Sequence, residues 1–516
     1  MSSATSRTEN LAKNIVWGYV ANIATMLLRF ISRTIFIYTL GSDYLGFNGL
    51  FTNILGILSF TELGIGGVLN YSLYKPLATG DTEKIKSLMA LYKKAYRIIM
   101  LVVLVVGIAI MPLLPYMIKG AENVEHVYLY YGFFLFNTVT SYMVSYKSGL
   151  MNAAQKEYVI TGINAATNVV VVLVQCIALL IFHNYLVYLF IQSIFQLLQN
   201  IVISICVDKQ FPLLGEKNIQ KLPKEEKRVL AENVEAMICH KIGDVCVHQT
   251  DNIIVSSFVS LIAVGKISNY TLITTSLNSI VAIVINNCVA SLGNFISVES
   301  KERRKEIFKV YNFLAFWIYG IVTIELFVLL QPFVEVWAGK KNLIDDFTIR
   351  LIVLEFYFTG LRVAVANFKA ACGIFKADKY IGIVQAIVNL ILSIVLAKLI
   401  GLPGVYIGTM AQGAVDWIWR PRLVYQMEFK ESSREYYVIW FRYLLLLLSM
   451  IFLFNMVASK ILVKISLLRI IVVGIIIGVF VNLIFYMIFY KTKEFLFLKN
   501  KVKYLLEKIW RKNKCI

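Results

Sequence analysis

Long apolar stretches separated by short polar ones recur along the whole chain. A helix needs roughly 20 predominantly apolar residues to cross a bilayer, and fourteen runs of about that length can be marked in the sequence. The pattern therefore predicts an all-α integral membrane protein with about 14 transmembrane helices. The runs cover residues 13–39, 45–74, 90–115, 126–147, 158–182, 184–207, 234–259, 266–296, 307–333, 347–369, 380–400, 403–424, 437–458 and 467–490.

Composition and charge support this interpretation. Hydrophobic residues make up 59% of the 516 positions, whereas an average soluble domain has roughly 45–50%. The net charge of +20 comes from Lys and Arg that lie between the apolar runs, so nucleic acid is not the expected partner. With a cytoplasmic N-terminus, 37 of the 51 Lys and Arg fall on the cytoplasmic side and 8 on the other, as the positive-inside rule requires. We therefore expect both termini to be cytoplasmic.

An internal repeat predicts the domain organisation. Lys147 and Tyr158 are eleven residues apart, and so are Lys369 and Tyr380, at an offset of 222. Two halves of six spans each would share their orientation in the membrane. The predicted parts are an N-terminal lobe at 1–207, a cytoplasmic linker at 208–233, a C-terminal lobe at 234–430, two additional spans at 431–490 and a basic amphipathic tail at 491–516.

The tail at 491–516 has two interpretations. Apolar residues at helical spacing alternate with nine Lys and Arg, against two acidic residues. This composition is typical of a helix that lies on an anionic leaflet. It is equally typical of an ordinary basic tail that follows the positive-inside rule.

Charged side chains inside the spans are the candidate functional residues, because burying them in lipid is costly. Arg29 and Arg33 lie four residues apart on one face of the first span. Guanidinium groups suit a phosphate or an acidic sugar. The alternative is that they pair with Glu62 of the second span and hold the lobe together.

The seventh span has a longer ionisable face. Lys241, Asp244, His248 and Asp251 follow one another at i, i+3, i+7 and i+10. We interpret them as the lining of a cavity, in which Lys241 helps to hold an anion and a carboxylate or His248 carries a coupling ion. The alternative is a set of buried ion pairs.

The tenth span has a similar face, with Glu355, Arg362 and Lys369 at intervals of seven. Arg362 is the stronger binding candidate, because Lys369 is near enough to the span end to reach water. Asp416 in the twelfth span stands alone, and a structural role is expected for it. The seven Cys contain no CxxC pair, so we expect no metal site.

Local motifs then indicate a family. Residues 250–255 (TDNIIV) with 264–270 (VGKISNY), and 40–46 (LGSDYLG) with 62–64 (ELG), resemble the starts of the two lobes in polysaccharide flippases of the multidrug/oligosaccharidyl-lipid/polysaccharide (MOP) exporter superfamily. Members usually have a small residue and then Tyr after the Val-Gly pair, whereas this chain has four residues between Gly265 and Tyr270.

The resemblance implies two six-helix lobes around a central cavity, plus two C-terminal helices. It also implies alternating-access transport of undecaprenyl-pyrophosphate-linked repeat units for O-antigen, capsule or exopolysaccharide across the bacterial inner membrane. Such a flippase has no catalytic residues and no cofactor, and coupling to H⁺ or Na⁺ is an option. Its partners would be membrane lipids, a polysaccharide polymerase and the chain-length machinery.

Three other functions compete with this one. A cation-coupled multidrug antiporter and a lipid II flippase are relatives within the same superfamily. A membrane polysaccharide polymerase belongs to another class and would need a sizeable extracytoplasmic loop or an acidic catalytic motif, neither of which is evident. The sequence has no P-loop, so ATP is not expected to be the direct energy source.

Overall fold

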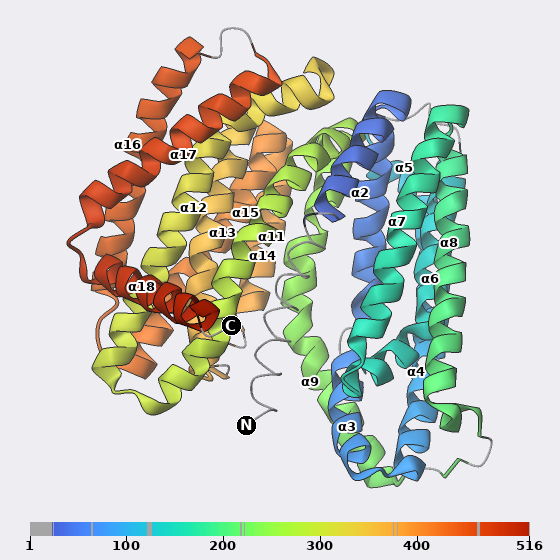
Figure 1. Ribbon diagram of the computed structural model, residues 1–516. Coiled ribbons are helices and arrows are strands. Elements are labelled where there is room, and N and C mark those ends of the chain that lie inside the picture. The colour runs from blue at the N-terminus through green and yellow to red at the C-terminus, as the bar shows by residue number, and fades with distance from the viewer. Residues whose placement is uncertain are drawn as a thin grey trace. The chain divides into compact units, whose positions relative to one another are not determined.

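The computed structural model describes residue 23 and residues 25–514 except 63–64, 121–125, 217–218, 221, 375, 379 and 462–464. Side chains at 60–61, 236–248, 283–284, 286–295, 297–298, 502, 504–506 and 508–514 lie outside this description. Within the described part of the chain, every regular element is a helix (Figure 1). The chain divides into two compact units, Met1–Gly265 and Lys266–Ile516.

The described part of the first unit includes helical residues 25–40. Its further elements are α2 (Asp43–Leu58), η1 (Ser59–Glu62), α3 (Ile65–Thr79), α4 (Thr82–Ile110), η2 (Met111–Leu113), α5 (Leu114–Met117), α6 (Val127–Ala153), α7 (Glu157–Phe182), α8 (Tyr185–Gln210), η3 (Pro212–Gly215), α9 (Lys224–Gln249), α10 (Asp251–Ile254), the π-helical turn η4 (Val255–Val259) and the first turn of α11 (Leu261–Val298).

The second unit contains the rest of α11. It continues with α12 (Lys301–Ala338), η5 (Lys340–Asn342), α13 (Asp346–Ala371), η6 (Lys376–Asp378), α14 (Ile381–Ile400), α15 (Leu402–Val424), the π-helical turn η7 (Tyr425–Phe429), α16 (Arg434–Ile461), α17 (Leu467–Phe489) and α18 (Lys493–Lys514).

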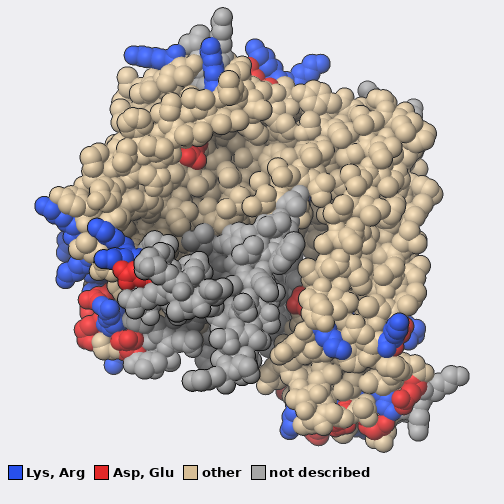
Figure 2. Space-filling model, in the orientation of Figure 1, with Lys and Arg blue, Asp and Glu red and all other residues tan. Residues whose placement is uncertain are grey.

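The predicted fold class is confirmed, because thirteen of the fourteen apolar runs, and the described part of the run 13–39, coincide with one or more of these helices. By length and composition alone, seven of the described helices are apolar enough to cross a membrane. On the face drawn in Figure 2, wide stretches along the sides of each unit carry no charged side chains, and Lys, Arg, Asp and Glu gather near the ends. The chain is thus a multi-pass membrane protein.

Three predicted spans are divided between elements, and one of them, the run 90–115, continues from α4 through η2 into α5. The run 45–74 divides into α2, the 3₁₀ turn η1 and α3, where Gly64, Gly66 and Gly67 follow Glu62 in the sequence. Glycine lowers helix stability by about 1 kcal/mol per residue relative to alanine, so this cluster favours a break. The run 234–259 divides into α9, α10 and η4.

In the first unit, α6 packs against α3, α4 and α8, and α9 packs against α2 and α3. The start of α11 also lies directly on the start of α2. A Cβ added to Gly265 would stand 2.0 Å from the backbone oxygen of Ser42, and one added to Gly46 would stand 2.3 Å from that of Leu261. The two backbones approach this closely because both positions lack a side chain.

In the second unit, α13 packs between α12 and α15, and α16, α17 and α18 cover α12. Aromatic side chains fill these contacts, and the rings of Phe316 on α12 and Tyr443 on α16 stack at 4.0 Å. The helices α14 and α15 form a hairpin in which Gly401 alone separates them, with φ +71°. That conformation is easily adopted by glycine.

Candidate functional site

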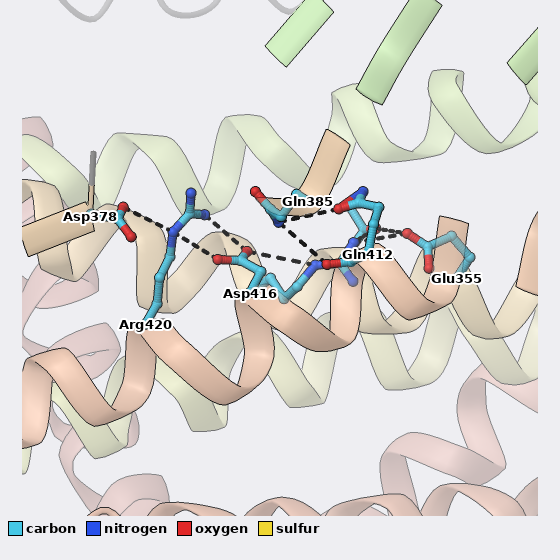
Figure 3. Close-up of polar contacts among 8 residues, drawn as sticks. Glu355, Asp378, Gln385, Gln412, Asp416 and Arg420 are labelled. Atoms are coloured by element: carbon cyan, nitrogen blue, oxygen red, sulfur yellow. Dashed lines mark hydrogen bonds and ion pairs between the residues drawn. The ribbon is translucent and has the colours of Figure 1, made fainter. Parts of the chain in front are cut away.

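Six charged side chains of the second unit form a continuous row, which we call the charge chain. Figure 3 labels four of them, Glu355, Asp416, Arg420 and Asp378. Carboxylates and cations alternate along it, and its members come from α13, η6 and α15. In order, they are Glu355, Arg362, Asp416, Arg420, Asp378 and Lys369.

The contacts within the charge chain are short. Arg362 Nη2 donates to Glu355 Oε1 at 2.8 Å, and its Nε lies 3.9 Å from Asp416 Oδ2. Arg420 donates through Nη1 to Asp416 Oδ2 at 2.9 Å, and through Nε to Asp378 Oδ2 at 3.2 Å. Lys369 closes the row with an ion pair to Asp378.

Helix periodicity explains how α13 and α15 supply the charge chain. Residues seven apart share one face of a helix, which places Glu355 beside Arg362, with Thr359 between them accepting from Arg362 Nη2 at 2.6 Å. Asp416 and Arg420 are neighbours on α15 through i,i+4 spacing. The structure thus places all three residues of the predicted face, Glu355, Arg362 and Lys369, in the charge chain, and Arg362 links Glu355 to Asp416.

A glycine on α15 lets the guanidinium group of Arg362 on α13 lie against the α15 backbone. A Cβ on Gly413 of α15 would stand 1.8 Å from Arg362 Nη1. The arginine therefore lies directly on the backbone of α15, where it reaches Asp416. Arg362 and Gly413 both line an apolar cavity of about 420 Å³, together with Phe358, Trp417 and Trp440 among others.

The charges of the charge chain neutralise one another within the protein. Three carboxylates and three cations balance, and the side chain of Asp416 is only 6% exposed. Charges withdrawn from water are tolerated when each is paired and hydrogen-bonded. A phosphate that bound Arg362 would have to compete with Glu355 and Asp416 for the same donors.

Sequence reasoning missed two members of the charge chain, Arg420 and Asp378, and interpreted Asp416 as isolated. The i,i+4 spacing of Asp416 and Arg420 was a usable signal. Asp378 lies in the short turn η6 outside any span, so no helical periodicity pointed to it. The predicted reach of Lys369 to water differs from its observed contact with Asp378, since the lysine side chain is 9% exposed.

In the first unit, Arg29 and Arg33 lie on helical residues 25–40. The Arg29 side chain is exposed, and Arg33 is half-buried close to Tyr188 of α8. Tyr188 belongs to an aromatic group in which the rings of Tyr130 and Tyr185 meet at 4.9 Å. The two arginines therefore differ in surroundings although they share a helix.

Glu62 lies at the break between α2 and α3. Its carboxyl group lies against the hydroxyl groups of Tyr96 on α4 and Tyr142 on α6. Tyr142 also donates to Ser59 Oγ at 3.0 Å. The interruption of the helix thus places a carboxyl group among three hydroxyl groups inside the first unit.

The predicted face of the seventh span is described in part. Lys241, Asp244 and His248 are on α9, but their side chains lie outside the described residues. Asp251 is half-buried at the start of α10. Their predicted roles therefore stay predictions.

Amide side chains next to this face join it to α2. Asn53 Nδ2 donates to Gln249 Oε1 at 3.0 Å, and Asn252 Nδ2 donates to Asn53 Oδ1 at 2.6 Å. Gly56 leaves room for Gln249, since a Cβ there would stand 2.5 Å from its Oε1. A polar contact therefore fastens α9 and α10 to α2 within the first unit.

Beyond α13, a thiol lies in a second charged cluster. Cys372 is close to Glu428 of η7, which forms an ion pair with Arg304 of α12. Burial, reinforced by the Glu428 carboxylate, raises the pKa of the Cys372 thiol to about 12. The thiol is therefore protonated at neutral pH.

Comparison with known proteins adds a family and a fold. The model of one family, described as polysaccharide biosynthesis protein, matches residues 11–289. No curated protein matches the chain. Lipid II flippase MurJ in an inward closed conformation is similar at a TM-score of 0.63 and 15% identity, over 92% of this chain and 100% of that one.

Two MATE transporters share the fold as well. An inward-facing transporter of the multidrug resistance MATE family of the MOP superfamily has a TM-score of 0.57 at 13% identity, over 79% of this chain and 96% of its own. A mutant of the Vibrio cholerae MATE transporter VcmN has a TM-score of 0.52 at 14% identity, over 84% and 99%. At these identities the likeness concerns the fold.

Proposed function

Because this chain belongs to the polysaccharide biosynthesis protein family, we propose that it is a flippase for undecaprenyl-pyrophosphate-linked oligosaccharide repeat units. It moves them from the cytoplasmic to the outer leaflet of a bacterial inner membrane by alternating access. Its fold is that of the membrane transporters and flippases of the MOP superfamily. The observation that carries the proposal is the family match, which extends over more than half of the chain.

Charge in the first unit supports an anionic substrate. Arg29 offers an exposed guanidinium on an otherwise largely apolar helix, and Arg33 follows one turn later. Arginine binds phosphate through paired, permanently charged donors. We propose that these two residues bind the pyrophosphate or an acidic sugar, and that Lys241 contributes a further positive charge. Arg362 takes part only if the substrate displaces Glu355 or Asp416.

Ion coupling is proposed for the acidic groups of the same unit. Glu62 lies at a helix break among hydroxyl groups, and Asp251 follows the end of α9, on which Asp244 and His248 also lie. Carboxylates inside membrane spans commonly carry protons or cations in transporters. An H⁺ or Na⁺ bound there would drive the conformational cycle, and a polysaccharide polymerase with its chain-length machinery would take over the flipped product.

Deleting the gene tests the proposed substrate. We expect lipid-linked oligosaccharide to accumulate on the cytoplasmic leaflet, where a glycosidase added to the outside of sealed membranes cannot reach it. Wild-type protein should restore access. Normal oligosaccharide distribution together with increased drug sensitivity would identify a multidrug antiporter and overturn the proposal, and accumulation of lipid II would identify a lipid II flippase.

Arginine variants test the binding site. A charge-assisted hydrogen bond contributes about 1.5–3 kcal/mol, so Arg29→Gln and Arg33→Gln should each lower the rate of oligosaccharide transport by roughly 10- to 100-fold. Arg29→Lys should retain more activity than Arg29→Gln. The matched control is Arg350→Gln, which removes an exposed arginine of the second unit and should leave transport unchanged. Equal activity of all four variants would contradict the anion site.

A further inference from the structure

The C-terminal helix α18 turns sharply away from α17 and lies across α12 (Figure 1). The turn is short and ordered by Thr492, whose hydroxyl accepts from the backbone N–H of Phe495 at 3.4 Å. The backbone N–H of Thr492 donates to Phe489 at the end of α17 at 2.9 Å. The direction of α18 is therefore fixed where α17 ends.

Two aromatic contacts orient α18 about its own axis. The ring of Phe495 stacks on Trp317 of α12 at 5.5 Å, and Arg303 of α12 lies 5.6 Å from the ring of Phe497. Arg303 and Trp317 are 14 residues apart, which is roughly 21 Å along a helix. Phe495 thus points along α12 into the apolar part of the unit, and Phe497 points toward the charged first turns of α12.

The apolar side of α18 follows from this orientation. Five further apolar residues share the side of Phe495 by helical spacing. These residues are Leu498, Val502, Leu505, Leu506 and Ile509. Phe495 packs on Trp317 of α12 and Tyr486 of α17, and both Phe495 and Leu498 are half-buried.

Lysines occupy the flanks and the opposite side. Lys499, Lys501 and Lys503 are all exposed. The acidic residue Glu494 is turned inward, where it borders a small cavity beside Lys309, and Glu507 lies 4.0 Å from Lys503. Between Lys491 and the C-terminus, nine Lys and Arg stand against these two carboxylates. The exposed side of α18 is therefore strongly cationic.

We propose that α18 binds anionic phospholipid headgroups through Lys499, Lys501 and Lys503, at the leaflet that surrounds the first turns of α12. An amphipathic helix with its apolar stripe in the acyl boundary and lysines at its flanks matches the geometry of a membrane surface. The three lysines point to negative lipid charge and not to zwitterionic lipid. The contact holds α18 flat and ties the end of α17 to the leaflet.

Backbone hydrogen exchange of the full-length protein tests the proposal. The purified chain is placed in nanodiscs of phosphatidylcholine alone or with phosphatidylglycerol. Each lysine near an anionic surface strengthens association by roughly fivefold. Amides of residues 499–514 should therefore exchange at least about tenfold more slowly with phosphatidylglycerol. The triple variant Lys499→Gln/Lys501→Gln/Lys503→Gln should lose this difference.

A matched variant separates lipid binding from net charge. Lys340→Gln/Lys341→Gln/Lys398→Gln removes the same charge, including two exposed lysines at the other end of α12, and should keep the difference between the two nanodiscs. Equal exchange of 499–514 in both nanodiscs for the wild type would overturn the proposal. The proposal would also be overturned if the amides of residues 499–514 were protected from exchange when RNA is added to phosphatidylcholine nanodiscs but were not protected by phosphatidylglycerol.

Discussion

At the scale of single residues, Asp416 is the centre of the charge chain, since it contacts Arg362 on one side and Arg420 on the other. Asp416 is the carboxylate that Arg362 and Arg420 share, because within the charge chain Glu355 pairs only with Arg362 and Asp378 contacts Arg420 but not Arg362. Breaking a buried ion pair leaves an uncompensated charge and costs about 3–5 kcal/mol. The role of Asp416 is thus electrostatic balance of two helices.

Neutralising Asp416 tests this role. Asp416→Asn keeps the side-chain volume and leaves two arginines facing each other, so we expect a loss of about 3 kcal/mol of stability and a clearly lower midpoint of thermal unfolding in detergent. The control is Glu335→Gln, because Glu335 pairs at 3.6 Å with Lys340, whose side chain is 83% exposed. An exposed pair contributes roughly 0–1 kcal/mol. Equal midpoints for the two variants would contradict the assignment.

Cys372 offers a test that depends on pH. With a pKa raised to about 12 by burial and by Glu428, its thiolate fraction should rise tenfold per pH unit up to that value. In a variant that retains only this cysteine, the maleimide reaction rate should climb from pH 7 to pH 10 without a plateau. Glu428→Gln should accelerate the reaction at pH 8, whereas Glu431→Gln, which removes a partner of Lys305, should not. A plateau near pH 9 would show an ordinary thiol.

At the scale of elements, the approach of α11 to α2 depends on residues without side chains. Ser42 and Gly265 meet through backbone atoms, and the amides of Asn53, Gln249 and Asn252 extend the contact along α2. Together they hold α9, α10 and the start of α11 against α2.

Two glycine-to-alanine substitutions separate the effect of close backbone packing from the effect of helix propensity. Gly265→Ala should destabilise the protein, because its Cβ would lie 2.0 Å from the Ser42 oxygen and the backbones must shift. Gly132→Ala on α6 meets no atom within 4 Å and should stabilise the helix by about 0.5–1 kcal/mol. Thermal unfolding of both variants should therefore change in opposite directions. A rise for Gly265→Ala would exclude a tight contact.

At the scale of the whole molecule, the α2–α10 contact is where the proposed transport cycle can be stopped. If alternating access separates these helices, a linker between them must block it. In a background without other cysteines, Asn53→Cys/Asn252→Cys joined by a short thiol linker should lose oligosaccharide transport and regain it on reduction. The control pair is Asn70→Cys/Asn152→Cys, which replaces a 3.3 Å contact between α3 and α6. Undiminished transport by the first linked pair would refute movement at this contact.

Much of this architecture was predictable from the sequence, because lipid imposes a length and a composition on every span. The seven-residue spacing also placed Glu355 beside Arg362. Contacts between elements distant in sequence were not predictable: nothing local in Asp378 indicates Arg420, and nothing in Gly413 indicates the guanidinium on it. The interruption at Glu62 was only suggested by its glycines, since glycines serve close packing as well as breaks.

The one-residue connection at Gly401 has a consequence for how the protein is made. Because a single residue connects α14 and α15, the two helices must enter the bilayer together. The ribosome therefore delivers them to the insertion machinery as a hairpin. Asp416 and Arg420 then enter lipid already neutralised by each other, after α13 has been synthesised. Lengthening this turn would uncouple the two insertion events, although Asp416 and Arg420, which both lie on α15, would still neutralise each other.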